Sequence, residues 1–297
     1  MKIIIAGGTG ALGQHLVEKL EKEHQIFILT RSQNKKISEN INLINYSNDI
    51  NKWSEYLKDS DVVINLVGES IANRRWSQNQ KQKILNSRLE SIQKISKALK
   101  IINHSPKVIM NASAVGYYKS SYNVVDESGS KGTDFLSHVC DQWEKAALDK
   151  LGKRTQRLVL LRIGIVLESN SGMLSKMIVP FKLCLGAIIG SGKQYIPWIH
   201  INDIVGIINY LINSDIKGPV NLVSPKIDNN FDFSKKLGRA LNRIVMLRVP
   251  SFLITLLLGE MSTMVLKSSN IKPDVILKSD YKFEFENLDD ALNDLLS

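Results

Sequence analysis

The stretch that decides the fold is Lys2-Ile3-Ile4-Ile5-Ala6, then Gly7-Gly8-Thr9-Gly10-Ala11-Leu12-Gly13, then Gln14-His15-Leu16-Val17-Glu18-Lys19-Leu20. A short run of β-branched residues ends in glycines and leads into residues with helical spacing, which predicts a strand, a tight turn and a helix. Such a turn exposes backbone N–H groups at a helix N-terminus, where they and the helix dipole favour a pyrophosphate. The spacing is G-x-x-G-x-x-G, and its position between the first strand and the first helix favours a dinucleotide site over a plain strand–helix turn. The predicted contacts in this turn are Gly7, Thr9, Gly10, Ala11, Leu12 and Gly13.

The composition is that of an ordinary globular protein. The chain has 297 residues, of which 43% are hydrophobic and 23% charged, and its formal net charge is +10. Because the lysines are scattered and no basic stripe carries interleaved aromatic residues, we expect no nucleic-acid partner. Cys140 and Cys184 have neither metal-binding nor redox spacing, so we expect no metal and a reducing compartment.

We expect a cytoplasmic protein with no membrane partner. The first strand begins at residue 2, which predicts that no signal or transit peptide precedes it. Residues 252–266 are the most membrane-like stretch, but they are shorter than the ~20 apolar residues that span a bilayer, and Glu260 interrupts them. We interpret the stretch as a buried helix or as a lid over a pocket.

The second predicted strand, residues 25–30, ends at Thr30-Arg31. In a dinucleotide fold this strand end faces the adenosine ribose, where an acidic residue binds the 2′-hydroxyl of NAD and an arginine accommodates the 2′-phosphate of NADP. No Asp or Glu lies between residues 25 and 37. The sequence therefore predicts NADP in preference to NAD, although an exposed arginine after a strand is an alternative interpretation of Arg31.

Five strand–helix units follow one another, and they predict an α/β fold: a doubly wound parallel Rossmann sheet with a smaller C-terminal α/β substrate lobe. The nearly continuous apolar run 61–69 is typical of a strand buried on both faces, and Gly68 at its end allows close approach of a cofactor. Later strands are expected over 107–114 and 157–166. We expect residues 1–165 to form the dinucleotide-binding domain, with 199–223 returning to it, and residues 166–198 and 224–297 to form the substrate or lid lobe.

Several stretches together resemble the extended and atypical short-chain dehydrogenase/reductases, and more narrowly the epimerase-like branch of the YfcH and SDR39U1 type. The stretches are the glycine turn with Thr30-Arg31, 65–69, Arg74-Arg75-Trp76 with Ser87-Arg88, 113–118, 190–203, 218–221 and 257–261. The resemblance covers essentially the whole chain. It implies NADP binding, with contributions from Thr30, Arg31, Leu66, Val67, Gly68, Lys83, Arg88 and Val166 in addition to the glycine turn.

The usual acid/base pair of that superfamily is missing. A short-chain reductase normally carries a tyrosine with a lysine four residues later, and none of the eight tyrosines here has that neighbour. The helix where the resemblance places the pair has Val139 and Trp143 instead. The candidate catalytic residues are therefore Ser113, Tyr117 and Glu69, and the candidate substrate contacts are Arg75, Trp198 and His200.

Two functions remain open. One is an NADP-dependent oxidoreductase or epimerase-like enzyme that acts on a small carbonyl or nucleotide-sugar-type substrate. The other is a non-catalytic or regulatory NADP-binding protein, which the missing acid/base pair favours. We expect an unidentified small-molecule substrate and a monomer or homodimer.

Overall fold

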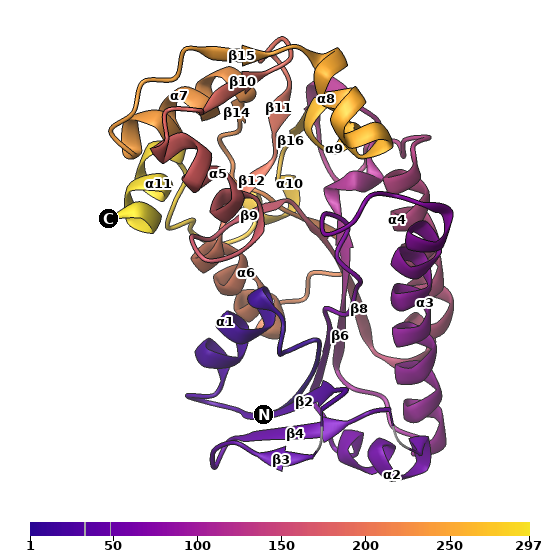
Figure 1. Cartoon of the computed structure of the whole chain (residues 1–297). Coiled ribbons are helices and arrows are strands. Elements are labelled where there is room, and N and C mark those ends of the chain that lie inside the picture. The colour runs from indigo at the N-terminus through magenta and orange to yellow at the C-terminus, as the bar shows by residue number, and fades with distance from the viewer. Residues whose placement is uncertain (33, 48) are drawn as a thin grey trace.

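Parallel strands form the centre of the molecule, as the apolar runs predict (Figure 1). The computed structural model describes residues 1–32, 34–47 and 49–297. Its main sheet has eight strands in the order β13-β8-β6-β5-β1-β2-β4-β3. Neighbouring strands run parallel except for the antiparallel edge pair β3–β4. The strands are β1 (Lys2–Ala6), β2 (Gln25–Thr30), β3 (Lys35–Lys36), β4 (Ile41–Asn45), β5 (Val62–Asn65), β6 (Val108–Ala114), β8 (Arg157–Ile163) and β13 (Gly218–Leu222).

Helices cover both faces of this sheet, so its inner strands are buried on both sides. In β1, Ile3 and Ile5 join the apolar cluster on one face, while Ile4 and Ala6 join the cluster on the other. The first face packs against α1 (Ala11–Leu20) and α6 (Ile201–Asn213), and the second against α2 (Ile50–Ser54), α3 (Gln78–Ile101) and α4 (Phe135–Ala146). The predicted doubly wound Rossmann sheet is confirmed.

The C-terminal part of the chain consists of short strands and helices, at the top of Figure 1. Its strand pairs are β9 (Ile165–Leu167) with β12 (Trp198–His200), β10 (Ala187–Ile189) with β15 (Leu247–Val249), and β11 (Tyr195–Ile196) with β14 (Asp228–Asn229). Its strand β16 (Ser269–Ile271) pairs with β7 (Ser121–Val125), which lies earlier in the chain. Its helices are α5 (Gly172–Lys182), α7 (Asn230–Ala240), α8 (Ser251–Leu258), α9 (Thr263–Leu266), α10 (Asp274–Leu277) and α11 (Leu288–Leu296). Single helical turns elsewhere are η1 (Glu55–Leu57), η2 (Val115–Tyr117), η3 (Ala147–Leu151), η4 (Gly152–Arg154) and η5 (Gly259–Ser262).

The division of the chain near residue 165 stays a prediction. Strand β13 lies in the main sheet beside β8, and α6 packs against α1, as a return of 199–223 to the first domain requires. A separate apolar cluster joins α5, β10, α7 and α11. Other contacts cross the division, since Ile276 joins the cluster of α1 and α6 and β16 pairs with β7.

The strand expected over 157–166 is interrupted at Gly164. The Gly164 N–H donates to Leu222 O at 3.0 Å, and a Cβ on this residue would lie 2.4 Å from Pro197 O. Strand β8 therefore ends at Ile163, and β9 pairs with β12 outside the main sheet. Two short strands replace the single predicted one.

The apolar stretch 252–266 is not a buried helix. It is divided among α8, η5 and α9, and α8 contains no buried residue. The interpretation as a buried helix is therefore wrong. Across the ranges that the structure describes, we find no helix with both the length and the apolar character needed to cross a bilayer.

Candidate functional site

The glycine turn lies where the carboxyl ends of β1 and β5 meet. Gly7 has a φ of +86°, a backbone conformation that favours glycine, and a Cβ there would lie 3.1 Å from the Leu66 carbonyl carbon. A Cβ on Gly13 would lie 2.4 Å from Gly7 O and 2.6 Å from Gly8 Cα. Both glycines are therefore required by close packing within the protein.

Gly10 differs from these two glycines because a side chain there would crowd a single backbone atom rather than several. It is the N-cap of α1 with an ordinary extended backbone, and no side chain caps the helix. A Cβ on Gly10 would meet only Gly7 O, at 3.3 Å. Thr9, Gly10 and Ala11 are exposed, and among the described residues the N–H groups of Ala11 and Leu12 have no hydrogen-bond acceptor. Such a cradle fits an anionic group.

The end of β2 places an arginine at the same edge of the sheet. Thr30 is buried, and its Oγ1 accepts a hydrogen bond from the Ser32 N–H at 3.2 Å. Arg31 is exposed, and among the described residues it forms no ion pair. Its guanidinium is thus available to an added anion.

Strand β5 ends earlier than the apolar run predicts because the Asn65 side chain redirects the chain. Asn65 Nδ2 donates to Asn111 Oδ1 at 2.7 Å and to Ser91 Oγ at 3.1 Å, while its Oδ1 accepts from the Val67 N–H at 3.3 Å. Leu66 and Val67 are half-buried beside the glycine turn. The backbone after β5 therefore forms one wall of the cradle.

Arg88 lies between this wall and α4. Its Nη1 donates to the Glu69 carbonyl at 3.1 Å and to the Ile84 carbonyl at 2.8 Å, and its guanidinium carbon lies 4.7 Å from the centre of a Trp143 ring. A Cβ on Gly68 would lie 2.9 Å from that carbon. Burial lowers the pKa of Arg88 from its ordinary value. A desolvated arginine thus lies next to the end of β5, whereas Lys83 is exposed on the same helix, and a cofactor contact by either residue stays a prediction.

Ser113, at the end of β6, belongs to a buried polar network. Its Oγ donates to Glu144 Oε1 at 2.6 Å, and Glu144 is held by Arg162 through bonds of 2.9 and 2.8 Å. Arg162 also donates to the Tyr118 hydroxyl at 2.8 Å. Although burial opposes its charge, the pair with Glu144 raises the pKa of Arg162. Ser113 is therefore positioned by protein groups, with its hydrogen already donated.

Tyr117 is the partly exposed aromatic residue beside this network. The Arg162 guanidinium carbon lies 3.9 Å from the centre of the Tyr117 ring, which fixes the ring by a cation–π contact. Burial raises the pKa of the neighbouring Tyr118 to about 12, so that hydroxyl stays protonated. Tyr117 is half-buried, which leaves part of its side chain accessible.

The remaining positions considered for catalysis are Val139 and Trp143, which replace the usual acid/base pair, and Glu69. Val139 and Trp143 are 2% and 5% exposed and belong to the α4 packing surface. Glu69 is exposed, its N–H donates to Ser87 Oγ at 2.9 Å, and its carboxylate lies 3.4 Å from Gln80 Nε2. A carboxylate in that setting is a weaker candidate than Tyr117 because it lies outside the buried network.

Of the candidate substrate contacts, Arg75 is exposed but already used. Its Nη2 donates to the Leu257 carbonyl, which ties the loop after β5 to α8. Since this bond joins the two sides of the molecule, Arg75 positions α8 in this structure. A direct substrate contact by Arg75 stays a prediction.

Trp198 and His200 are not available as direct contacts. They are 0% and 1% exposed, and Trp198 belongs to the core of the C-terminal part. His200 Nδ1 accepts from the Asn202 N–H at 3.1 Å and caps α6, while its Nε2 lies 3.3 Å from Asp294 Oδ2. We therefore do not retain either residue as a substrate contact. Val166, in β9, is half-buried and packs beside the cluster that holds α1 and α6.

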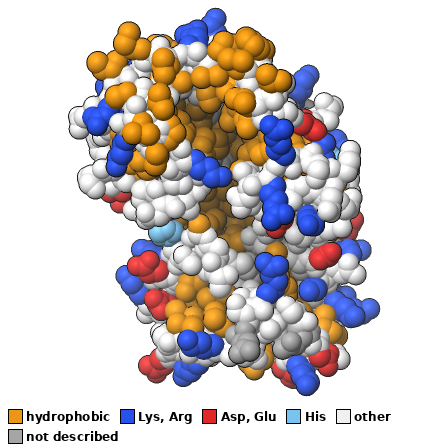
Figure 2. Space-filling model, viewed as in Figure 1, with side chains coloured by type: hydrophobic (Ala, Val, Ile, Leu, Met, Phe, Trp, Pro, Cys, Tyr) orange, Lys and Arg blue, Asp and Glu red, His pale blue; other side chains and the backbone are white. Residues whose placement is uncertain are grey.

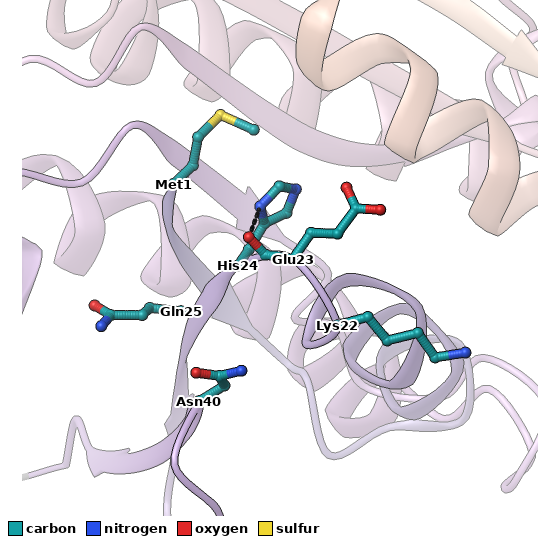
Figure 3. Close-up of a pocket in the computed structure, with 6 residues that line it drawn as sticks. All are labelled: Met1, Lys22, Glu23, His24, Gln25 and Asn40. Atoms are coloured by element: carbon teal, nitrogen blue, oxygen red, sulfur yellow. Dashed lines mark hydrogen bonds between the residues drawn. The ribbon is translucent and has the colours of Figure 1, made fainter.

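A shallow pocket elsewhere is unrelated to this site (Figure 3). Its lining residues are Met1, Lys22, Glu23, His24, Gln25 and Asn40. Gln25 begins β2 and Met1 precedes β1, so the pocket lies at the amino ends of the strands, opposite the glycine turn. Within the described ranges, no group of three or more His, Cys, Asp or Glu residues could hold a metal ion.

Sequence reasoning missed Glu144 and Arg162, which together organise the polar network beside β6. The signal for Arg162 was a lone charge inside the apolar strand Arg157-Leu158-Val159-Leu160-Leu161-Arg162-Ile163. Glu144 gave a weaker signal, because a glutamate in an amphipathic helix is ordinarily solvated. Only the fold brings the two together.

Comparison with known proteins gives consistent matches. The family described as "NAD dependent epimerase/dehydratase family" matches residues 3–149, and a "Domain of unknown function (DUF1731)" matches residues 249–295. An epimerase family protein of Staphylococcus haemolyticus is 38% identical over 299 residues, covering 99% of both chains. A crystal structure of the human epimerase family protein SDR39U1, isoform 2, with NADPH has 31% identity and a TM-score of 0.88, covering 100% of this chain and 99% of that one. A UDP-glucuronic acid 4-epimerase from Bacillus cereus in complex with NAD has 17% identity and a TM-score of 0.77, with 99% and 96% covered, and shows the fold alone.

Proposed function

Because the chain belongs to the NAD-dependent epimerase/dehydratase family, we propose that it is an NADP-dependent oxidoreductase or epimerase-like enzyme for a small carbonyl or nucleotide-sugar-type substrate. The observation that carries the proposal is the cradle beside Gly10, which the packing of Gly7 and Gly13 shapes and which no side chain of the described residues fills. The similar human protein was crystallised with NADPH.

The cradle suits the pyrophosphate of a dinucleotide. Backbone N–H groups at the N-terminus of α1 supply donors and a partial positive charge. Thr9, Ala11 and Leu12 flank Gly10, and the backbone of Leu66 and Val67 lies against Gly7. These residues would hold the central part of the cofactor.

Arg31 is the basis for preferring NADP over NAD. Its planar guanidinium can donate two hydrogen bonds to one phosphate, and no carboxylate in residues 25–37 opposes a dianion there. Thr30, next to it, keeps its Oγ1 engaged with the Ser32 N–H. Arg31 can therefore form an ion pair with the 2′-phosphate of NADP, whereas the 2′-hydroxyl of NAD carries no charge for it to pair with.

At the other end of the cofactor we assign Gly68, Arg88, Lys83 and Val166. Gly68 leaves room for the Arg88 guanidinium, and Arg88 brings a cation next to Trp143, at the position where the superfamily has its lysine. Lys83 lies one turn before Ser87, whose Oγ accepts from the Glu69 N–H. When bound, a nicotinamide would give or accept a hydride.

We assign Tyr117 to the reacting carbonyl or hydroxyl group and Ser113 to positioning. The Tyr117 hydroxyl can donate a hydrogen bond that orients a carbonyl oxygen, and Arg162 holds the ring. Ser113 acts through Glu144 and Arg162, because its hydrogen is already donated to Glu144. Because no lysine lies four residues after Tyr117 to assist proton transfer by its hydroxyl, we expect slow or narrowly selective turnover.

The test is a panel of carbonyl compounds and nucleotide sugars followed by NADPH absorbance. For any substrate found, Tyr117→Phe should lower turnover about tenfold or more without changing NADPH affinity. Ser113→Ala should lower turnover less, with the same unchanged affinity. A rate that ignores both substitutions would transfer the chemistry to Glu69.

The second candidate is a non-catalytic or regulatory NADP-binding protein. The buried Val139 and Trp143, in place of a tyrosine and a lysine, favour it. Tight NADPH binding with no oxidation across the whole panel would support this function over the enzymatic one.

A further inference from the structure

One end of the molecule, formed by residues 179–185, 243–248 and 252–258, carries an unusual concentration of exposed apolar side chains. Leu183, Leu185, Ile244, Met246, Phe252 and Leu256 are between 60% and 82% exposed. Figure 2 shows apolar side chains gathered at this end on both sides of a hollow. Exposed apolar side chains that gather in one region often mark an interaction surface. We name this surface the apolar tip.

The three segments of the apolar tip are held together by direct contacts. Strands β10 and β15 pair, and the Gly190 N–H donates to Val249 O at 2.8 Å. Arg243 Nε donates to Lys182 O at 2.9 Å, and Cys184 lines a shallow pocket with residues 242–244, 246 and 247. Helix α8 follows two residues after β15. The three segments of the apolar tip therefore lie at the same end of the folded chain, on both sides of the hollow in Figure 2.

The charges around the apolar tip have a single sign. No Asp or Glu occurs in residues 169–202 or in residues 233–259. Lys182, Lys193, Arg243 and Arg248 are exposed and, among the described residues, form no ion pair. Glu260, the first acid after α8, is paired with Lys81. The surface thus combines apolar side chains with uncompensated cations.

From this combination we propose that the apolar tip docks on a membrane surface rich in anionic phospholipids. Leucine, isoleucine, methionine and phenylalanine side chains would enter the boundary between headgroups and acyl chains, while the four cations would meet lipid phosphates. Long basic side chains suit this arrangement because their stems cover apolar surface while their charges stay at headgroup level.

Other occupants fit the observations less well. A second copy docked face to face would oppose two sets of cations with no acid between them, and like charges disfavour such a contact. A nucleic acid would accept the cations, but Phe252 is the one exposed aromatic residue of the three segments that could stack on a base, since Phe181 is buried. The inference concerns a surface outside the cofactor cradle and stands independently of the proposed function.

The experiment is co-sedimentation of the full chain with vesicles. We expect binding to vesicles of phosphatidylcholine with phosphatidylglycerol, weak binding to phosphatidylcholine alone, and loss of binding as salt rises. Arg243→Gln/Arg248→Gln and Phe252→Gln/Leu256→Gln should each weaken the binding about tenfold or more.

Two matched pairs control for charge and for exposed apolar surface elsewhere. Lys97→Gln/Lys100→Gln removes two exposed cations from α3, and Tyr122→Thr/Val124→Thr removes two exposed apolar side chains from β7. Both pairs should bind as the unaltered chain does. Circular dichroism verifies that every variant is folded.

Several results would overturn the inference. They are no binding to anionic vesicles at low salt, equal binding with and without phosphatidylglycerol, or equal binding by the tip pairs and the control pairs. A dimer that Phe252→Gln/Leu256→Gln converts to a monomer, with no vesicle affinity in either form, would assign the surface to self-association. Binding to RNA in place of vesicles would likewise reject the lipid.

Discussion

Gly10 and Gly13 lie three residues apart in the same turn, yet substitution should affect them in opposite ways. A Cβ on Gly13 would lie 2.4 Å from Gly7 O, 2.6 Å from Gly8 Cα and 2.8 Å from Gly8 C. Since carbon atoms pack at about 3.5–4.0 Å, α1 would have to move by roughly 1 Å away from the turn. A Cβ on Gly10 would meet only Gly7 O, at 3.3 Å, and the Gly10 backbone is ordinary for any residue.

These distances give separate energetic expectations. Crowding against backbone atoms in Gly13→Ala costs about 1–3 kcal/mol or more, offset by about 1 kcal/mol of better helix propensity. Because the contacts at 2.4 and 2.6 Å are with backbone atoms, we expect the upper end of that cost and a net loss of about 2 kcal/mol in the free energy of unfolding. Gly10→Val replaces a tolerated N-cap residue and should cost no more than about 1 kcal/mol, but its side chain would occupy the cradle.

The assay pairs urea unfolding, followed by circular dichroism, with NADPH titration. Gly10→Val should unfold nearly as the unaltered chain does and lose NADPH affinity, whereas Gly13→Ala should lose stability. Gly152→Ala is the control, because its Cβ would lie 3.7 Å from Leu158 Cδ2 and far from the turn. Unchanged NADPH affinity in Gly10→Val would refute the assignment of the cradle, and undiminished stability in Gly13→Ala would refute the packing argument.

Two further predictions concern stability. Glu144→Ala leaves Arg162 buried without its carboxylate and should lower the free energy of unfolding by about 3–5 kcal/mol, whereas Ser113→Ala should lower it by about 1 kcal/mol. Chemical denaturation measures both losses, and equal losses would contradict the network. Burial lowers the pKa of His200 below its ordinary 6.5, so the unfolded chain takes up a proton at a higher pH than the folded chain does. The stability that neutral His200 contributes to the folded chain is therefore lost as pH falls from above 6.5 through the lowered pKa. His200→Asn keeps an N-cap for α6 and should flatten the decline in melting temperature between about pH 7.5 and 5, and an unchanged decline would exclude His200 as its source.

The elements beside the glycine turn could be predicted from the sequence because local patterns determine them. The apolar residues of β1, the glycines and the helical spacing of α1 all indicate one arrangement, and the structure confirms it. The end of β5 was not predictable in the same way. Asn65 turns the chain through bonds to Asn111 and Ser91, which are 46 and 26 residues away in the sequence.

The polar side chains of the site were predicted least well, because their partners depend on tertiary contacts. Ser113 lies at the expected strand end, but its hydrogen bond to Glu144 crosses to α4. Trp198 and His200 occur in a distinctive stretch of sequence, yet Trp198 packs in the core and His200 caps α6. The exposure of α8 could not be deduced from its composition, since a run of leucines is more often buried.

The central claim is that the cradle beside Gly10 and the arginine after β2 bind NADP in preference to NAD. Calorimetric titration of the unaltered chain and of Arg31→Asp with NADPH and with NADH tests it most directly. We predict that the unaltered chain binds NADPH about tenfold or more tightly than NADH, the scale of a hydrogen bond to a charged group, and that Arg31→Asp erases or inverts this preference. Equal affinity of the unaltered chain for the two cofactors, or a preference that survives in Arg31→Asp, would contradict the claim.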